Sequence, residues 1–444
     1  MGKGNRVVVI GGGAAGLLAG ITAARNGAGT IILEKMDVPG RKMMITGKGR
    51  CNITNTCAIP EFIRNLPGNG KFLNGALRRF TNEDMMDLLE SHGLPLVKER
   101  GGRVFPASGR ARDVLDTLLA ILTEAGGRVV TNAQAVGLVL KDGRVTGVRY
   151  CNVEDDGRKE GQDYRSASQR REKLGPAHVL DADAVIVCTG GASYPGTGSD
   201  GNFVPVLEKA GHTVEPLLPA LVPLQPEEGF TEELDGLALK NVRATLCDNG
   251  QAVTSEFGEL LFTRGTVAGP IALTMSRAAA RLAHYGNRGL DLVLDLKPAL
   301  DEEKLDARIL RDFQEDGKRT LAEAVRKLVP QPLVAAILDA AYLDGAKAVS
   351  QVSKQERQAL RETLKHFSIP LAGTLPVEAA IVTAGGVSLK EIDPKTMASR
   401  KVKGLYFAGE VMDVDGYTGG FNLQAAFSSG YVAGTAAAAA DDVK

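Results

Sequence analysis

Val7-Val8-Val9-Ile10-Gly11-Gly12-Gly13-Ala14-Ala15-Gly16 is the stretch that decides the fold. The β-branched run is typical of a buried parallel strand, and the alanine- and leucine-rich segment from Ala14 to Asn26 predicts a helix. Thr30 to Leu33 predicts a second strand, so a βαβ unit begins almost at the first residue. Its glycines have the GxGxxG spacing of a dinucleotide-binding turn.

Each glycine of this motif has its own expected task. Gly11 permits the tight turn, Gly13 lets the backbone approach a pyrophosphate, and Gly16 lets the helix pack closely on the sheet. The free N–H groups at the helix start, at Ala14 and Ala15, attract phosphates. Glu34 ends the second strand, where it can accept hydrogen bonds from a ribose diol and would repel a 2′-phosphate. A purely structural glycine turn with a surface glutamate is the alternative.

Composition and charge narrow the class of protein. The 444 residues are 44% hydrophobic and 24% charged, with 53 basic and 53 acidic side chains. This balance argues against nucleic acid or a membrane as partner, although a local charged patch stays open. Five scattered cysteines indicate a reducing compartment, and Cys51 and Cys57 have no histidine nearby, so no metal site is expected. The first residues run directly into a strand and no long apolar run follows, so we expect a cytoplasmic location. The oligomeric state is left open.

The rest of the chain changes character twice. Residues 112–125 predict a helix, residues 129–130, 136–140, 145–150 and 184–187 predict strands, and the charged segment 152–176 predicts an exposed excursion. After about Asp200 short strands are expected at 221–224, 242–247, 252–255, 260–263 and 292–296, and residues 300–367 are mostly helical. From Glu378 the α/β pattern resumes, with strands at 381–383 and 405–408 and a helix at 422–439.

Three later features favour FAD over NAD as the dinucleotide. A buried strand ends in Thr189-Gly190-Gly191, where glycines would let the backbone pass close to the cofactor. A second strand ends in Ala408-Gly409-Glu410, which supplies a tight glycine and an acid. The segment from Gly419 to Ala426 then places another helix start, whose partial positive charge could stabilise a reduced flavin. An ordinary strand-to-turn transition and a glycine-started packing helix remain the alternatives.

These motifs resemble the two-dinucleotide-binding flavoproteins, and most closely the bacterial single-chain family that includes BaiN-type dehydro-bile-acid reductases and aminoacetone-oxidase-like enzymes. The resemblance rests on GRKMMITGKGRCNITN at 40–55, RVFP at 103–106, TGGASYPGTGS at 189–199, VTAGGV at 382–387, and residues 404–430. It implies an α/β, Rossmann-type FAD-binding domain assembled from both chain ends, interrupted by a β-barrel-like insert that carries a small helical domain. The implied boundaries are 1–200 and 373–444 for the FAD domain, 201–298 and 351–372 for the β-rich insert, and 299–350 for the helical insert.

The resemblance also implies which residues contact FAD. The pyrophosphate falls to the glycine motif, the adenosine ribose to Glu34, the adenine side to Arg41, Lys42 and the backbone of Val136, and the ribityl and pyrimidine end to Glu410 and the helix starting at Asn422. The full expected set is Gly11, Gly13, Ala14, Ala15, Gly16, Glu34, Lys35, Gly40, Arg41, Lys42, Thr46, Gly47, Cys51, Asn52, Val136, Thr189, Gly190, Gly191, Gly409, Glu410, Gly420, Phe421, Asn422, Leu423 and Ala425.

One segment departs from the family pattern. Where relatives more often have Phe-Thr-His-x-Gly-x-Ser-Gly-Pro, this chain has Arg264 in place of the histidine, and Thr266 and Ala268 also differ. Because this segment is expected to approach the substrate cavity, the substrate of a relative cannot be transferred to this chain.

The expected chemistry is redox chemistry at the flavin. Only one complete GxGxxG unit is present, so NAD(P)H is expected as a transient reductant that leaves before a second, hydrophobic small-molecule substrate enters. The favoured substrate is an enone, with Tyr194 and Arg264 as candidate catalytic groups, although Tyr194 could be a packed aromatic and Arg264 a structural cation. An oxidase of a small amine that uses O₂, and a non-catalytic or RNA-associated flavoprotein, are the other hypotheses. No histidine is assigned to catalysis, and Cys51 lacks a CxxC partner for a redox disulfide.

Overall fold

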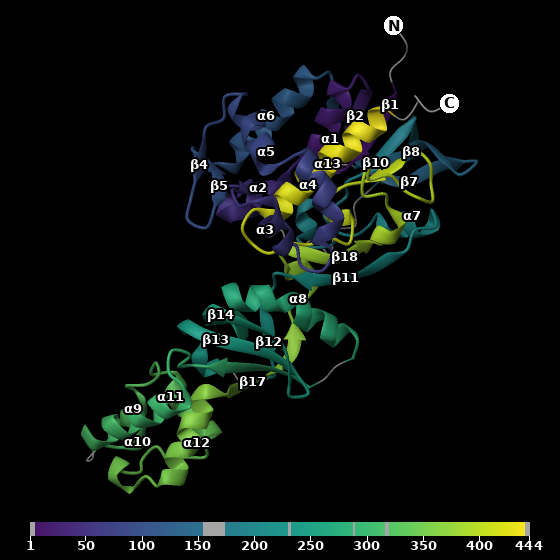
Figure 1. Cartoon of the computed structure of the whole chain (residues 1–444). Coiled ribbons are helices and arrows are strands. Elements are labelled where there is room, and N and C mark those ends of the chain that lie inside the picture. The colour runs from purple at the N-terminus through teal and green to yellow at the C-terminus, as the bar shows by residue number, and fades with distance from the viewer. Residues whose placement is uncertain (1–4, 154–173, 230–231, 287–288, 316–318, 440–444) are drawn as a thin grey trace. The chain divides into compact units, whose positions relative to one another are not determined.

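The computed structural model of the chain describes all residues except 1–4, 154–173, 230–231, 287–288, 316–318 and 440–444 (Figure 1). The chain forms two compact units, of which the first joins Met1–Leu218 to Val377–Lys444 and the second is Pro219–Pro376. Most of the charged segment 152–176, expected to be an exposed excursion, lies outside the described residues.

A five-stranded parallel sheet forms the centre of the first unit. Its strand order is β19-β10-β1-β2-β6, with β1 at Arg6–Ile10, β2 at Gly29–Leu33, β6 at Arg128–Val130, β10 at Ala184–Val187 and β19 at Leu405–Phe407. All four residues of β10 are fully buried, as the continuous apolar run predicts for a parallel strand covered on both faces. Because β1 and β19 lie in one sheet, the expectation of a Rossmann-type domain built from both chain ends is confirmed.

Two helices from opposite chain ends, α1 (Ala14–Arg25) and α13 (Phe421–Ala438), pack against each other beside this sheet (Figure 1, purple and yellow). Glycines on α13 make the close contact possible. A Cβ on Gly430 would lie 2.4 Å from the carbonyl oxygen of Ala15, and one on Gly434 would lie 2.3 Å from a backbone oxygen of α1. Small residues therefore let the two backbones touch.

Smaller elements complete the first unit. The helices are α2 at Arg41–Gly49, α3 at Ile59–Arg64, α4 at Asn74–Arg79, α5 at Asn82–Glu90, α6 at Ala111–Glu124 and α7 at Val204–Lys209. Two three-stranded sheets have the orders β3-β5-β4 and β7-β8-β9, and β11 pairs with β18. Their bounds are β3 Thr54–Asn55, β4 Leu96–Lys98, β5 Arg103–Pro106, β7 Ala133–Lys141, β8 Arg144–Val153, β9 Leu174–Asp181, β11 Val214–Ala220 and β18 Val382–Val387.

Residues 201–218 belong to the first unit, although we expected the insert to begin at residue 201. The reason is a long-range pairing, because β11 forms a sheet with β18 from the C-terminal part of the chain. Such a pairing joins segments more than 160 residues apart and leaves no local signal in the sequence.

The second unit is a closed six-stranded barrel with helices. The strand order is β12-β15-β14-β13-β16-β17, with β12 at Leu224–Pro226, β13 at Ala238–Asp248, β14 at Gln251–Thr263, β15 at Thr266–Ala268, β16 at Leu290–Asp295 and β17 at Phe367–Thr374. The helices are α8 at Pro270–His284, α9 at Glu302–Glu315, α10 at Leu321–Val325, α11 at Leu333–Ala340 and α12 at Lys354–Lys365. The expected β-barrel-like insert with its helical piece is therefore confirmed.

One barrel hairpin is longer than expected. The two short strands expected at 252–255 and 260–263 are one strand, β14, because it pairs with β13 along most of its length and bulges absorb the irregular pattern. The turn between β13 and β14 contains Asn249 and Gly250, both with positive φ, which suits the twist of a tight hairpin. Among the described helices none is both long and apolar enough to span a membrane.

The contact between α1 and α13 makes a stability prediction. Gly430→Ala should lower the free energy of unfolding by about 1–3 kcal/mol, because the added methyl group collides with the α1 backbone and forces the helices apart. Gly75→Ala is the matched control, since a Cβ there meets only one oxygen, at 3.7 Å. Urea unfolding followed by circular dichroism measures both variants. A Gly430→Ala protein as stable as the Gly75→Ala protein would contradict the close packing.

Candidate functional site

The expected cofactor residues gather at the carboxyl ends of the parallel strands. The turn after β1, the end of β2, the loop after β10 and the segment after β19 all lie at this edge of one sheet. In open α/β sheets ligands bind at this edge. The topology therefore brings the glycine motif, Glu34, the Thr189-Gly190-Gly191 turn and Glu410 to one place.

The glycine motif has the geometry that a diphosphate needs. A Cβ on Gly11 would lie 2.4 Å from the carbonyl oxygen of Cys188, and one on Gly16 would lie 1.8 Å from the carbonyl oxygen of Gly11, so neither position admits a side chain. A Cβ on Gly13, in contrast, would meet no atom within 4 Å. Gly13 is also the N-cap of α1 and provides no side-chain cap, so the first N–H groups of the helix face open space.

Glu34 is a buried carboxylate held by two backbone amides. Its Oε2 accepts a hydrogen bond from Gly12 N at 2.7 Å and its Oε1 accepts one from Met36 N at 2.8 Å. Burial raises the pKa of Glu34, and the two amides oppose this shift only in part. Since each carboxylate oxygen can accept two hydrogen bonds, Glu34 keeps acceptor capacity for a ribose diol.

The fit of a dinucleotide rests on three observations. Open space lies over Gly13, Glu34 retains acceptor capacity, and Ser199 Oγ is buried without a hydrogen-bond partner in the described part of the chain. Ser199 lies beside the Thr189-Gly190-Gly191 turn, because its Oγ would be 2.8 Å from a Cβ on Gly190. An unpaired buried hydroxyl beside a phosphate-type turn suits a polar ligand. The residues present therefore fit FAD.

The segment after β2 is tied to the glycine motif. Gly40 begins α2 in a left-handed conformation, and its N–H donates to the carbonyl oxygen of Gly12 at 2.9 Å. Arg41 forms an ion pair with Asp37, and Lys35 forms one with Asp200. Two of the three basic residues that the resemblance places at the cofactor, Lys35 and Arg41, are thus engaged with carboxylates.

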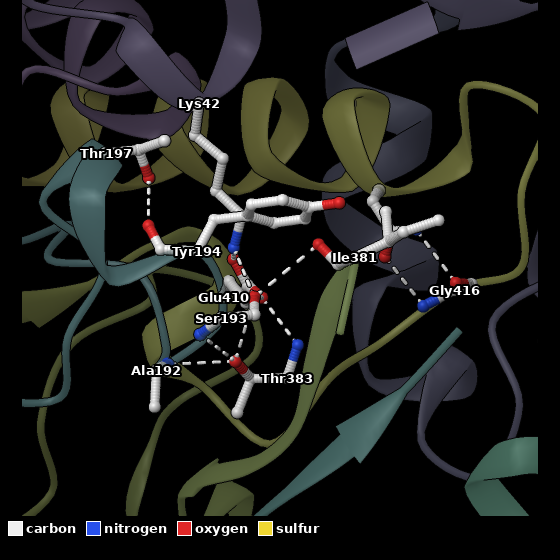
Figure 2. A network of polar contacts seen from close by, with 10 residues as sticks. Lys42, Ala192, Ser193, Tyr194, Thr197, Ile381, Thr383, Glu410 and Gly416 are labelled. Atoms are coloured by element: carbon white, nitrogen blue, oxygen red, sulfur yellow. Dashed lines mark hydrogen bonds and ion pairs between the residues drawn. The ribbon is translucent and has the colours of Figure 1, made fainter. Parts of the chain in front are cut away.

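Lys42 and Glu410 form an ion pair that joins the two chain ends (Figure 2). Lys42 Nζ lies 2.7 Å from Glu410 Oε2 and donates to Ser193 Oγ at 2.6 Å. Glu410 Oε1 accepts from Thr383 N at 2.7 Å and from Ser193 Oγ at 3.2 Å. The resemblance placed Lys42 on the adenine side and Glu410 at the ribityl end, whereas in the structure their side chains are in direct contact.

Ser193 and Thr383 lie at the candidate site, although neither was among the residues expected from the sequence. Thr383 Oγ1 accepts from the N–H groups of Ala192 at 2.9 Å and Ser193 at 3.1 Å, across 190 residues of sequence (Figure 2). Both residues lie inside motifs that carried the resemblance, TGGASYPGTGS and VTAGGV. Membership of those motifs was the only signal that could have found them.

The loop from Thr46 to Asn52 is held from both chain ends. The helix α2 is interrupted at Thr46 and Gly47, and Cys51 takes a left-handed conformation with φ of 62°. Asn52 bridges to the C-terminal helix in the amide orientation that satisfies both partners, accepting from Gly420 N at 3.0 Å and donating to the carbonyl oxygen of Thr54 at 3.2 Å. The loop is therefore fixed beside the start of α13.

The first side chains of α13, those of Phe421 and Asn422, are engaged with other parts of the protein, so it is the backbone of this helix start that is left to contact a cofactor. The Phe421 ring packs edge-on against Phe62 with centroids 4.9 Å apart, so it belongs to the core. Asn422 Oδ1 accepts from Gly416 N at 2.7 Å, and its Nδ2 donates to the carbonyl oxygen of Gly416 at 2.8 Å. Leu423 and Ala425 follow on the same helix.

Val136 occupies an irregular position in β7. The ladder between β7 and β8 shifts register between Ala135 and Gly137, which leaves Val136 without a ladder partner. The N–H of Ala133, three residues earlier, donates to the carbonyl oxygen of Glu34 at 2.9 Å. The start of β7 is therefore anchored beside Glu34, and a backbone contact from Val136 to an adenine stays a prediction.

The two candidate catalytic residues belong to different units. Tyr194 lies in the first unit, directly after Ala192 and Ser193, whose N–H groups donate to Thr383. Its backbone is left-handed, with φ of 53°, and its carbonyl oxygen accepts a hydrogen bond from Thr197 Oγ1 at 2.7 Å. Arg264 is exposed at the two-residue turn between β14 and β15, and its N–H donates to Asp235 Oδ1 at 2.7 Å. A non-glycine residue with positive φ is strained, and such strain gathers at functional sites.

A serine–histidine–glutamate arrangement lies elsewhere in the first unit. His212 Nδ1 is 3.1 Å from Glu391 Oε2, and its Nε2 is 3.0 Å from Ser399 Oγ. Ser399 Oγ also accepts from the N–H groups of Lys401 and Val402, and burial lowers the pKa of His212 despite the nearby Glu391. A serine whose oxygen is occupied by two amides is a turn residue, so we assign this group a structural role. Among the described residues, no three His, Cys, Asp or Glu side chains are grouped to hold a metal ion.

Cys51 gives a prediction about thiol chemistry. Burial raises its pKa to about 12, and burial raises that of the half-buried Cys57 to about 11, so both thiols are neutral near pH 7. The thiolate is the nucleophile. Iodoacetamide at pH 7.5 should therefore leave Cys51 unmodified in the native protein and modify it in guanidinium chloride, as read by peptide mass spectrometry. Rapid native modification of Cys51 would instead indicate a reactive cysteine.

Comparison with known proteins agrees with this geometry. The family model described as HI0933-like protein Rossmann domain matches residues 5–436. The 3-dehydro-bile acid delta(4,6)-reductase of Clostridium scindens is 29% identical and aligns over 98% of this chain and 99% of that protein. The ribosomal RNA dihydrouridine synthase of Escherichia coli is 30% identical over 96% of each chain.

Solved structures share the fold. The 3-ketosteroid-delta4-(5alpha)-dehydrogenase of Rhodococcus jostii has a TM-score of 0.50 at 15% identity, covering 98% of this chain and 96% of that one. The open conformation of a flavocytochrome c3 fumarate reductase has a TM-score of 0.50 at 16% identity, covering 99% and 78%. The chain thus belongs to the HI0933-like Rossmann family and is an FAD-dependent oxidoreductase.

Proposed function

We propose that the protein reduces a carbon–carbon double bond conjugated to a carbonyl group, with electrons from NAD(P)H. Two relatives support this reaction class, because a bile acid delta(4,6)-reductase and a dihydrouridine synthase both add hydrogen across such a bond. The observation that carries the proposal is the open dinucleotide cradle formed by Gly13, Glu34 and the Thr189-Gly190-Gly191 turn. When bound there, FAD would supply the redox-active ring.

The chain's own groups would bind and orient in this reaction. The N–H groups at the start of α1 would hold the diphosphate, and Glu34 would accept the ribose hydroxyls. Tyr194 is the proposed proton donor, because its strained backbone is held in place by surrounding hydrogen bonds. Arg264 is the proposed polarising cation, and the exposure of this residue at the turn between β14 and β15 is the feature that supports this role.

A second candidate substrate is a uracil ring carried on RNA. It is favoured by a basic cluster, in which the guanidinium carbons of Arg50 and Arg103 lie 4.1 Å and 5.8 Å from the centre of the Phe105 ring and both side chains contact Glu99. Lys48, Arg100 and Arg110 are exposed nearby in the sequence. A zero net charge does not exclude such a local patch, and clustered basic side chains suit a phosphate backbone.

One anaerobic experiment separates the candidate reactions. The purified protein is reduced with NADPH or NADH and then mixed with a steroid enone, with ribosomal RNA, or with O₂, while the flavin absorbance is followed. We expect reoxidation by an enone or by RNA at least tenfold faster than in buffer without acceptor. Fast peroxide formation with O₂ and no response to either double-bond substrate would replace the reductase proposal with an oxidase.

The raised pKa of Glu34 makes FAD binding depend on pH. Ribose hydroxyls donate to an ionised carboxylate, so FAD affinity should rise with pH and level off above the raised pKa of Glu34 in the FAD-free protein. The folding stability of the FAD-free protein should change with pH in the opposite direction, because a raised pKa means that the folded state favours the protonated form of Glu34. The stability that Glu34 contributes is therefore present below pH 4.5 and is lost as the pH rises through its folded pKa. Glu34→Gln should bind FAD more weakly and with a flat pH profile, measured by quenching of flavin fluorescence.

The matched control is Glu208→Gln, a substitution on the exposed face of α7. It should keep both the affinity and the pH profile of the unmodified protein. A sloping profile that survives in Glu34→Gln would assign the titration to another group.

A further inference from the structure

We infer that Lys42 is a positioning residue, which acts on FAD by orienting the carboxylate of Glu410. We infer that Thr383 helps to orient the same carboxylate. This inference rests on the proposed FAD site. It differs from the expectation that Lys42 contacts the adenine side directly, and it assigns a role to Thr383, which was not among the expected cofactor residues.

The first argument is the way in which Glu410 is held. Three donors reach its carboxylate: Thr383 N and Ser193 Oγ at one oxygen, and Lys42 Nζ at the other. A carboxylate can accept about four hydrogen bonds. About one acceptor position therefore remains, on the oxygen bound to Lys42, and the direction of that oxygen is set by the ammonium group.

The second argument is where this remaining position lies. Glu410 Oε2 is 3.9 Å from the place of a Cβ on Gly190, in the turn expected to pass the cofactor. At the preceding residue, a Cβ on Gly409 would lie 2.8 Å from Ala15 Cβ at the start of α1. The Lys42 and Glu410 side chains are 24% and 20% exposed, so the pair borders open space and is not sealed in the core. The oxygen that Lys42 orients is thus close to the glycine turn expected to pass the cofactor, and its residue directly follows a glycine that contacts the start of α1.

The third argument is the position of Thr383. Its N–H donates to Glu410, while its Oγ1 accepts from the N–H groups of Ala192 and Ser193 (Figure 2). A Cβ on Gly191 would lie only 2.3 Å from the same Oγ1, so the turn and the threonine are in tight contact. Thr383 therefore fixes the position of the Ala192–Ser193 backbone, through its side chain, relative to the Glu410 carboxylate, which its N–H contacts.

A double-mutant cycle tests whether Lys42 acts through Glu410. The rate at which FAD leaves the diluted holoprotein is measured by flavin fluorescence for Lys42→Met, Glu410→Gln and the double variant. If Lys42 acts through Glu410, each single change should raise the rate about tenfold and the double change should raise it little further. Independent contacts would multiply to about 100-fold, which would overturn the inference.

Conservative variants separate positioning from a general loss of structure. Thr383→Ser should keep the release rate within about twofold, and Thr383→Val should raise it about tenfold, because Val leaves two N–H groups without an acceptor. Lys71→Met, on the exposed surface, and Thr254→Val, on β14, are the matched controls. Equal release from the Thr383→Ser and Thr383→Val proteins would overturn the role of Thr383.

The outcomes also distinguish this inference from the proposed function. A folded, unmodified protein that takes up no FAD would remove the proposed site itself. FAD binding by the unmodified protein together with multiplying effects of Lys42→Met and Glu410→Gln would keep the site and remove the coupling. If Glu410→Gln does not fold, as judged by circular dichroism, Glu410→Asp takes its place in the cycle with the same criteria.

Discussion

Close approach of backbone to backbone is the constraint on which the rest of this structure depends. Gly16 lies so near Gly11 that a Cβ would be 1.8 Å from its carbonyl oxygen, and Gly430 of α13 touches α1 in the same way. These contacts leave no room for side chains, so the first helix is pressed onto the sheet and the last helix onto the first. The N–H groups that open α1 are thereby held at a fixed place at the edge of the sheet.

The two carboxylates of the candidate site are held in fixed positions on this backbone frame. Glu34 is buried and held by two amides, and Glu410 is held by a lysine, a serine and a backbone N–H. A carboxylate that cannot rotate presents its remaining acceptor positions in one direction, which favours a ligand of matching shape. The cradle therefore joins a positive helix start, suited to phosphates, to acidic positions suited to sugar hydroxyls.

Specificity for the second substrate is a separate matter from cofactor binding. The family relationship covers nearly the whole chain, yet the relatives carry names as different as a bile acid reductase and a ribosomal RNA dihydrouridine synthase. What the family membership supports for this chain is therefore the FAD-dependent oxidoreductase class, and it does not fix the second substrate. The exposed turn at Arg264 and the basic cluster at Arg50 and Arg103 are features of this chain that such differences could use.

The sequence by itself determined the parts that depend on local pattern. The glycine spacing, the acid after the second strand and the strand-and-glycine motifs at both ends were sufficient to predict a Rossmann-type dinucleotide domain, because glycine spacing and apolar runs are local properties. The β-barrel-like form of the insert was implied by the family resemblance, since the residue pattern alone predicted only a β-rich middle with a helical piece. Only the tertiary structure decided that Lys42 meets Glu410, that Thr383 holds the Ala192–Ser193 backbone, and that residues 201–218 join the first unit through β11 and β18. Lys42 and Glu410 are 368 residues apart in the sequence, and Thr383 is about 190 residues from the backbone that it holds. A hydrogen bond needs its two atoms within about 3 Å of each other, and that proximity arises only when the sheet brings distant segments to one edge.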